Sequence, residues 1–270
     1  MEKHKDPSGA AGGAAASPPT ASGSLTFDGK PLVAGGKKNV YDYPYDAEAQ
    51  ADITKRWKTG DTGYRIAIAV PKGFNPSEPQ RVFIPFAPTN NAEQAKSGNV
   101  GAFDSYAAAC VANGWVCIAY GTNIGSTTHD ADLLNAYQKI QSVWPNFRTW
   151  EFAVGGFSGG AKGCFFPCAY LLKQDCKVIG AYLSGCNEDR SDRGKDLYKT
   201  PSSGYRRIRV FMSTGNKDNY VSKAQAEAVG DSLKKHGMRE QRSEWFEGGH
   251  SIHTPHFDAA LKWFAEPVGK

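Results

Sequence analysis

The order of expected strands and helices predicts an α/β fold, with a mainly parallel central sheet and helices on both of its faces. Two observations predict it. From residue 115 onwards, short apolar segments typical of buried strands alternate repeatedly with segments of helical periodicity. Ahead of them, two strand-like segments are separated by a loop rich in Gly, Pro and Asn, which suggests an antiparallel start. Such alternation is typical of parallel strands joined by helices.

The first half of the folded body begins near Val40. Strands are expected over residues 64–70 (YRIAIAV), 81–86 (RVFIPF) and 115–120 (WVCIAY). Between the last two, Asp104 can cap a helix that ends at Gly114 and turns Tyr106 inward. The strand that follows is apolar throughout, as expected of a strand buried on both faces.

The second half continues the alternation. Its expected elements are helices over 133–144, 161–173, 222–237 and 257–264, strands over 150–157, 178–184, 209–212 and 243–246, and a polar loop over 187–204. The third of these helices has the clearest start, because Ser222 and Gln225 form a capping box, and Gly237 closes it.

Composition favours one domain. The chain has 270 residues, of which 40% are hydrophobic, enough for one large core over residues 25–270. Residues 7–24 are almost wholly Pro, Gly, Ala, Ser and Thr, so residues 1–24 are expected to be a flexible tether. The net charge of +5 is small, and no basic run is interleaved with aromatic residues, so we do not expect nucleic acid as a partner. Sequence does not indicate the oligomeric state.

The expected location rests on the same tether. No stretch approaches the ~18 consecutive apolar residues that span a bilayer. The charged start has no apolar segment behind it, so no intact signal peptide is visible. Such tethers often separate an export signal or lipid anchor from a catalytic domain. We therefore favour an exported protein (periplasmic, lipoprotein-tethered or secreted) whose signal has been removed, with a cytoplasmic enzyme as the alternative.

The cysteines indicate no metal site. None of the 6 cysteines has the Cys-x-x-Cys spacing of a zinc site, and the six histidines form no metal-binding pattern. Cys164 and Cys168 lie one helical turn apart, where a disulfide would constrain little. Cys176 and Cys186 flank an expected strand and are too far apart to pair. Buried free thiols are expected for most of them. We expect neither a metal nor an organic cofactor.

A nucleophile motif stands between an expected strand and an expected helix. The segment Gly156-Phe157-Ser158-Gly159-Gly160 matches the pattern Gly-x-Ser-x-Gly. In this turn the serine adopts a strained conformation that projects its hydroxyl above the sheet, and small neighbours let the helix pass close to the strand. The motif alone is weak in a glycine-rich chain, but its position between strand and helix makes it specific. Ser158 is therefore the candidate nucleophile.

A serine hydroxyl needs a base, and a histidine base needs an acid to orient it. Asp218 follows the expected strand 209–212, and His250 follows the last short strand. The three candidates thus lie past the carboxyl ends of strands, where open parallel sheets bind ligands. Alternatives remain open: the acids Glu188, Asp189 and Asp192 follow another strand, and the histidines His253 and His256 follow His250 closely. His129 precedes a helix and is read as a solvent or rim residue.

The order Ser158, Asp218, His250 is that of α/β-hydrolases. From about residue 63 to 264, the chain resembles this superfamily, and within it most resembles esterases of the dienelactone-hydrolase and polyester-depolymerase-like groups. The resemblance rests on the elbow at Ser158, the Gly-x-x-Asp loop at Asp218, and the Gly-Gly-His250 segment before a terminal helix. It implies an α/β-hydrolase fold with little or no cap domain.

Two parts of the site are less well marked. An oxyanion needs two N–H donors, of which Gly159 is expected to supply one. The second usually comes from the loop after an early strand, but that loop lacks the His-Gly pair common in the family, so Thr89 or Asn90 is the candidate. Phe157 and Tyr220 are expected to contact substrate, and two further aromatic residues could line the same groove, Tyr120 and Trp245.

These residues together predict a serine hydrolase that cleaves carboxylic esters through an acyl-enzyme. The charged segment 187–204 argues against a lipase lid, so short-acyl, sugar or polyester substrates are expected over long-chain lipids. A serine peptidase or amidase would use the same triad. A non-catalytic binding protein is the alternative from a different class.

Overall fold

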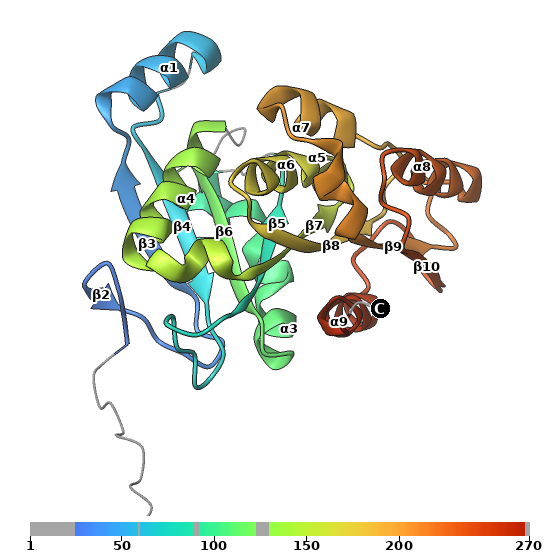
Figure 1. The fold of residues 1–270 in the computed structure, drawn as a ribbon, viewed down its shortest axis with the longest axis horizontal. Coiled ribbons are helices and arrows are strands. Elements are labelled where there is room, and N and C mark those ends of the chain that lie inside the picture. Colours follow the sequence, from blue (N-terminus) through green and yellow to red (C-terminus); the bar gives the residue numbers. More distant parts are fainter. Residues whose placement is uncertain (1–24, 59, 89–91, 123–129, 268–270) are drawn as a thin grey trace, which may run out of the picture.

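The computed structural model describes residues 25–58, 60–88, 92–122 and 130–267, so the expected tether lies outside the described residues. Its centre is an eight-stranded sheet in the order β10-β9-β8-β7-β5-β6-β4-β3 (Figure 1). The strands are β3 (Asn39–Pro44), β4 (Gly63–Ala69), β5 (Arg81–Phe86), β6 (Val116–Thr122), β7 (Glu151–Phe157), β8 (Lys177–Ser184), β9 (Arg209–Gly215) and β10 (Gln241–Phe246).

The directions of the strands identify the fold. β4 runs antiparallel to both of its neighbours, β3 and β6. All other neighbouring strands are parallel, and β5 lies between β6 and β7 although it precedes both in the sequence. A sheet whose second strand is reversed and whose third and fourth strands exchange places has the topology of the α/β-hydrolase fold. The predicted fold class is thus confirmed.

Helices cover both faces of this sheet (Figure 1). The α-helices are α1 (Ala47–Trp57), α2 (Ala92–Lys96), α3 (Ala107–Ala112), α4 (Asp130–Val143), α5 (Gly159–Gly163), α6 (Phe165–Lys173), α7 (Ser191–Tyr198), α8 (Lys223–Lys235) and α9 (Thr254–Ala265). Buried side chains of α4, α6 and α8 form one hydrophobic core, and those of α3 and α9 form a second. No helix in the described ranges is long and apolar enough to cross a membrane.

Several sequence predictions need correction. Asp104 caps no helix: it lies in the 3₁₀ helix Val100–Ser105 and forms an ion pair with Lys38, while α3 begins after Tyr106. The polar segment 187–204 is not a plain loop, because it contains α7 and the start of the 3₁₀ helix Ser202–Arg207. The helix was not predicted because most of its residues are exposed and polar. Its buried residues, Ser191 and Gly194, are too small and too few to give a recognisable apolar periodicity.

Other elements were missed or divided. Helix α1 and the small hairpin of β1 (Thr26–Phe27) and β2 (Lys30–Pro31) were not expected. The helix predicted over 161–173 is two helices, α5 and α6, which meet at Cys164. The capping box of α8 is confirmed, since Ser222 and Gln225 cap each other reciprocally.

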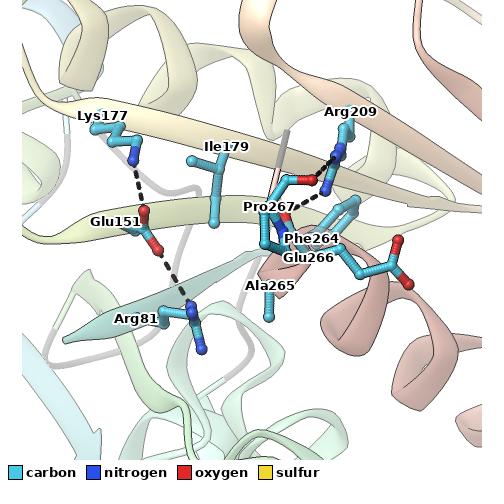
Figure 2. A pocket seen from close by; sticks show the side chains of 9 residues that line it. All are labelled: Arg81, Glu151, Lys177, Ile179, Arg209, Phe264, Ala265, Glu266 and Pro267. Atoms are coloured by element: carbon cyan, nitrogen blue, oxygen red, sulfur yellow. Dashed lines mark hydrogen bonds and ion pairs between the residues drawn. The ribbon is translucent and has the colours of Figure 1, made fainter. Parts of the chain in front are cut away.

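The amino ends of the strands carry an ion-pair cluster. Glu151, at the start of β7, lies between Arg81 at the start of β5 and Lys177 at the start of β8 (Figure 2). Its carboxylate oxygens lie 3.1 Å from Arg81 Nε and 2.6 Å from Lys177 Nζ. Burial raises the pKa of Glu151, but these two cations outweigh burial and hold the pKa below its ordinary value. The cluster links the amino ends of the three neighbouring strands β5, β7 and β8.

The candidate site lies at the opposite ends of the strands, the carboxyl ends. In the sheet register, Phe157 is paired with Ser184, and Ser184 with Ser213. Gly215, at the end of β9, is paired with Phe246 at the end of β10. The carboxyl ends of β7, β8, β9 and β10 therefore lie in one row, and the loops that leave them meet.

Candidate active site

Ser158 occupies a strained turn between β7 and α5. Its φ and ψ angles are 53° and −117°, which are rare for a residue with a side chain. The backbone N–H of Ser158 donates a 2.8 Å hydrogen bond to the carbonyl oxygen of Ser184. This is the geometry of a nucleophile elbow, in which strain is balanced by the surrounding backbone.

The glycines of the motif are required by close backbone contacts. A Cβ atom on Gly156 would lie 2.6 Å from the carbonyl oxygen of Phe86 and 2.6 Å from the carbonyl carbon of Gly160. A Cβ atom on Gly160 would lie 2.1 Å from the same Phe86 oxygen. Any larger side chain would push α5 away from the ends of β5 and β7. The small residues thus permit the sharp turn that presents Ser158.

The loop after β5 lies against the start of α5. A Cβ atom on Gly159 would lie 3.0 Å from Pro88 Cγ, so this loop adjoins Gly159. The N–H of Gly159 belongs to the first turn of α5, where helical N–H groups have no carbonyl partner within the helix. Thr89 and Asn90, the candidates for the second oxyanion donor, lie outside the described residues. Their role stays a prediction.

Asp218 and His250 form a hydrogen-bonded pair. Asp218 Oδ2 lies 2.7 Å from His250 Nδ1, and the two side chains are 1% and 17% exposed. Asp218 Oδ1 accepts hydrogen bonds from the backbone N–H groups of Tyr220 and Val221, at 2.7 and 3.0 Å. Because an ionised carboxylate only accepts, Nδ1 of the imidazole must carry the proton. Nε2 is then free to accept a proton, as a general base must.

Backbone contacts hold the two loops of this pair together. Asn216 N–H donates to the carbonyl oxygen of Phe246, and Lys217 N–H donates to that of Gly248, both at 2.9 Å. A Cβ atom on Gly215 would lie 2.3 Å from the carbonyl oxygens of both Gly248 and Gly249. The loop of the acid and the loop of the base are therefore fixed relative to each other before any ligand binds.

His250 also lies beside the nucleophile elbow. The ring of Phe157, the residue before Ser158, lies 4.5 Å from the imidazole of His250 between centroids. Among the described residues no hydrogen bond joins Ser158 Oγ to His250. In unliganded sites this bond is often long and shortens when substrate binds.

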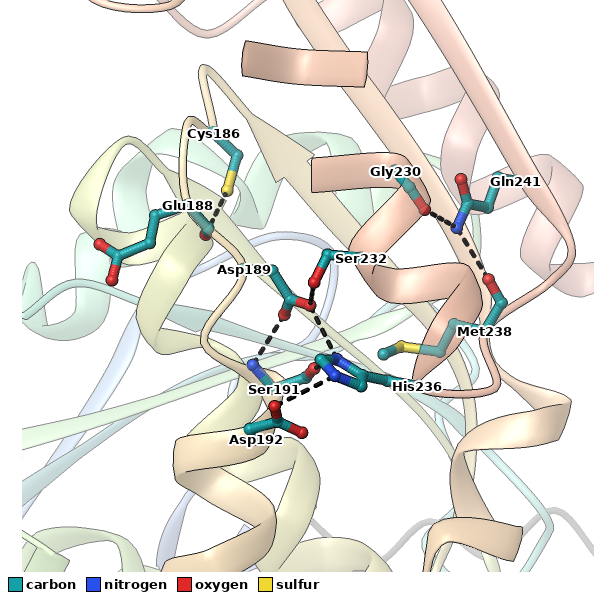
Figure 3. A network of polar contacts seen from close by, with 10 residues as sticks. All are labelled: Cys186, Glu188, Asp189, Ser191, Asp192, Gly230, Ser232, His236, Met238 and Gln241. Atoms are coloured by element: carbon teal, nitrogen blue, oxygen red, sulfur yellow. Dashed lines mark hydrogen bonds and ion pairs between the residues drawn. The ribbon is translucent and has the colours of Figure 1, made fainter. Parts of the chain in front are cut away.

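The alternative acids have other partners. Asp189 accepts hydrogen bonds from Ser232 Oγ and from the N–H of Ser191, and it lies 2.9 Å from Nδ1 of His236 (Figure 3). Asp192 lies 3.1 Å from Nε2 of the same histidine. This network joins the start of α7 to the end of α8. Glu188 is bound by three cations instead, namely Lys162, Arg190 and Arg193.

The alternative bases are also engaged elsewhere. His256 Nδ1 lies 2.9 Å from Ser213 Oγ, and its Nε2 lies 3.3 Å from Glu244. Burial and the neighbouring His253 lower the pKa of His256 below its ordinary value. His253 stacks on Phe246 at 4.6 Å. The structure brings Asp218 to His250 and to neither of these histidines.

The predicted aromatic residues differ in their surroundings. Tyr220 is 69% exposed, and its ring lies 4.8 Å from that of His250. Phe157 is half-buried, and its ring lies 4.5 Å from that of His250. Tyr120 is buried in a hydrophobic core and Trp245 is exposed on β10. Tyr220 is therefore the aromatic side chain best exposed to a substrate beside His250.

One residue of this site was missed in the sequence. Gly185 directly follows β8, and a Cβ atom there would lie 2.9 Å from His250 Cε1. The signal was available, since Ser184-Gly185 ends a strand at the same edge as the motif serine. A glycine carries no reactive group, so motif chemistry alone does not single it out.

No protein-family profile matches the chain, and no curated protein matches it. Among solved structures, it is similar to a ferulic acid esterase, with 11% identity, a TM-score of 0.49, and coverage of 84% of this chain and 96% of that one. A cold-adapted esterase from an Arctic intertidal metagenomic library has 14% identity and a TM-score of 0.49, over 83% and 94% of the two chains.

A third similar structure is an α/β serine hydrolase without a lid from Xanthomonas campestris. It has 15% identity and a TM-score of 0.49, over 76% of this chain and 89% of that one. With TM-scores below 0.5, these similarities carry no argument about function. The fold rests on the sheet topology, and the functional interpretation rests on the geometry of the site.

Proposed function

We propose that this protein is a serine hydrolase that cleaves carboxylic esters, with Ser158 as nucleophile, His250 as base and Asp218 as the orienting acid. One observation carries the proposal. The Asp218–His250 pair, at 2.7 Å, is held beside a serine whose strained backbone is typical of a nucleophile elbow. In acyl transfer, a buried carboxylate orients the imidazole, and the imidazole removes the proton of such a serine.

The reaction follows from these positions. His250 Nε2 removes the Ser158 proton as Oγ attacks the ester carbonyl, and the imidazolium then protonates the departing alcohol. Asp218 remains ionised and stabilises the imidazolium. The N–H of Gly159, with that of Thr89 or Asn90, would hold the oxyanion. Water activated by His250 then hydrolyses the acyl-enzyme and restores the serine.

The surroundings favour a polar or compact substrate. Helix α7 follows β8 and carries charged residues on its exposed side. Glu188, in the segment between β8 and α7, forms ion pairs with three basic side chains. A lid that covers long acyl chains needs an apolar inner face. We therefore propose short-acyl, sugar or polyester esters as the substrate class, with Tyr220 and Phe157 in contact with the substrate.

The test is hydrolysis of short and medium p-nitrophenyl esters by wild type, Ser158→Ala and the control Ser142→Ala. Ser142 is an exposed serine, and its hydroxyl donates a hydrogen bond to the carbonyl oxygen of Lys139. Wild type and the control are expected to be active, and Ser158→Ala to lose at least a thousandfold in kcat. Equal activity in Ser158→Ala would rule out this nucleophile.

A fluorophosphonate probe distinguishes the remaining alternatives. Labelling of wild type but not of Ser158→Ala, without ester hydrolysis, would indicate a peptidase or amidase, to be assayed with peptide anilides. No labelling of folded wild type would indicate a binding protein that retains the fold.

A further inference from the structure

We propose that Gly185 is a positioning residue for His250: its missing side chain leaves the space in which the imidazole lies. The inference deepens the proposed function, on which its kinetic consequence rests. Its structural content, the placement of one imidazole ring, can be measured without any substrate.

Gly185 cannot move away from the site. Its N–H donates a 2.9 Å hydrogen bond to the carbonyl oxygen of Ser213 on β9. The carbonyl of the preceding residue, Ser184, accepts the hydrogen bond from Ser158 N–H on the other side. Its φ of +56° also lies in the left-handed region that favours glycine. The backbone at Gly185 is therefore held between β9 and the nucleophile elbow.

The imidazole fills the space beside this backbone. A Cβ atom on Gly185 would lie 2.9 Å from His250 Cε1, 3.1 Å from His250 Nδ1 and 3.2 Å from Phe157 Cε2. The first distance is shorter than real Cβ contacts, so one of these groups would have to shift. Asp218 binds Nδ1 at 2.7 Å, and the rings of Phe157 and Tyr220 lie 4.5 and 4.8 Å from the imidazole. The ring can retreat only by weakening one of these contacts.

The atoms nearest to Gly185 are those that matter for the base. Nδ1 carries the bond to Asp218, and Cε1 is covalently bound to Nε2, the nitrogen that would accept the Ser158 proton. A shift of the ring by a few tenths of an ångström changes both. Since a misplacement of about 1 Å can cost about a hundredfold in rate, a methyl group on Gly185 is expected to lower kcat by about ten- to a hundredfold with little change in KM.

The experiment compares Gly185→Ala with the matched control Gly114→Ala. Gly114 also has a positive φ, +74°, but a Cβ atom there would meet nothing within 4 Å. Both variants place alanine in the left-handed region, so both bear comparable backbone strain. Only the first crowds His250. Any difference between them reports the contact with the ring.

The structural readout is the proton NMR resonance of His250 Nδ1–H, assigned by its loss in His250→Gln. We expect this resonance to shift or broaden in Gly185→Ala and to remain as in wild type in Gly114→Ala. A wild-type resonance in folded Gly185→Ala would overturn the inference. If wild type proves inactive, this readout still decides the inference, so its failure is distinct from that of the proposed function.

A second comparison applies if Gly185→Ala does not fold. Phe157→Ala removes one of the rings that confine the imidazole, so the double variant Gly185→Ala/Phe157→Ala gives His250 room to move. The His250 Nδ1–H resonance of the double variant is expected to differ from that of Phe157→Ala alone. Identical resonances in the two folded variants would show that the methyl group does not reach His250 and would overturn the inference.

Discussion

The backbone N–H of Ser158 donates a 2.8 Å hydrogen bond to the carbonyl oxygen of Ser184, which ties the candidate nucleophile to the end of the neighbouring strand. The next residue along that strand, Gly185, adjoins His250. The carboxyl end of β8 therefore contacts both Ser158 and His250, and a change in this segment affects both residues.

Asp218→Asn is expected to lower kcat/KM by up to about 10⁴-fold, the loss seen when a triad aspartate becomes an amide, because an amide can donate to Nδ1 and favour the wrong tautomer of His250. The control is Asp192→Asn, since Asp192 faces His236 instead and should matter little. The measurement is ester hydrolysis at neutral pH. A large loss in the Asp192 variant, with Asp218→Asn fully active, would assign the acid to the α7 segment.

Gly160→Ala is expected to destabilise the protein by about 1–3 kcal/mol and to reduce labelling of Ser158. The new Cβ atom would lie 2.1 Å from the carbonyl oxygen of Phe86, so α5 must move. Gly60→Ala is the control, because a Cβ atom there meets nothing within 4 Å. Urea unfolding measures both. Equal stability of the two variants would contradict the close contact between β5 and α5.

Glu151→Gln is expected to lower the free energy of unfolding by about 1 kcal/mol at pH 7, a modest value because Arg81 and Lys177 are half exposed. Since the cations lower the pKa of Glu151 in the folded state, its contribution is present above the unfolded pKa and is lost as pH falls through the folded pKa. The difference between variant and wild type should thus shrink below about pH 4. Glu227→Gln, at an exposed pair, should show no comparable difference at pH 7.

The cysteines are expected to resist labelling in the native protein. All six are free and buried. Burial raises the pKa of Cys186 to about 11, so very little of its reactive thiolate is present at pH 8. Burial also raises the pKa values of Cys110 and Cys164. A thiol-reactive chromophore should therefore react slowly at pH 8 and should count 6 thiols in denaturant. Rapid native labelling would contradict the burial of these side chains.

Much of the local structure was predictable. The turn at Ser158 and the capping box at Ser222 are set by residues a few positions apart, so their patterns are visible in the chain. Asp104 shows how such patterns fail: a residue suited to capping is drawn instead into an ion pair with Lys38, 66 positions away. Helix α7 was missed for a related reason, since its charged face gives little apolar periodicity.

The fold class and the candidate residues could be predicted from the sequence, because periodicity, turn chemistry and motif spacing are properties of neighbouring residues. Which acid meets which histidine depends on the tertiary structure. Asp218 and His250 are 32 positions apart, and they meet because the register of β9 and β10 aligns the ends of both strands. Asp189 is directed to His236 by the packing of α7 and α8. Such long-range contacts depend on the packing of strands and helices, which no local pattern records, and the same holds for the space that Gly185 leaves for the imidazole.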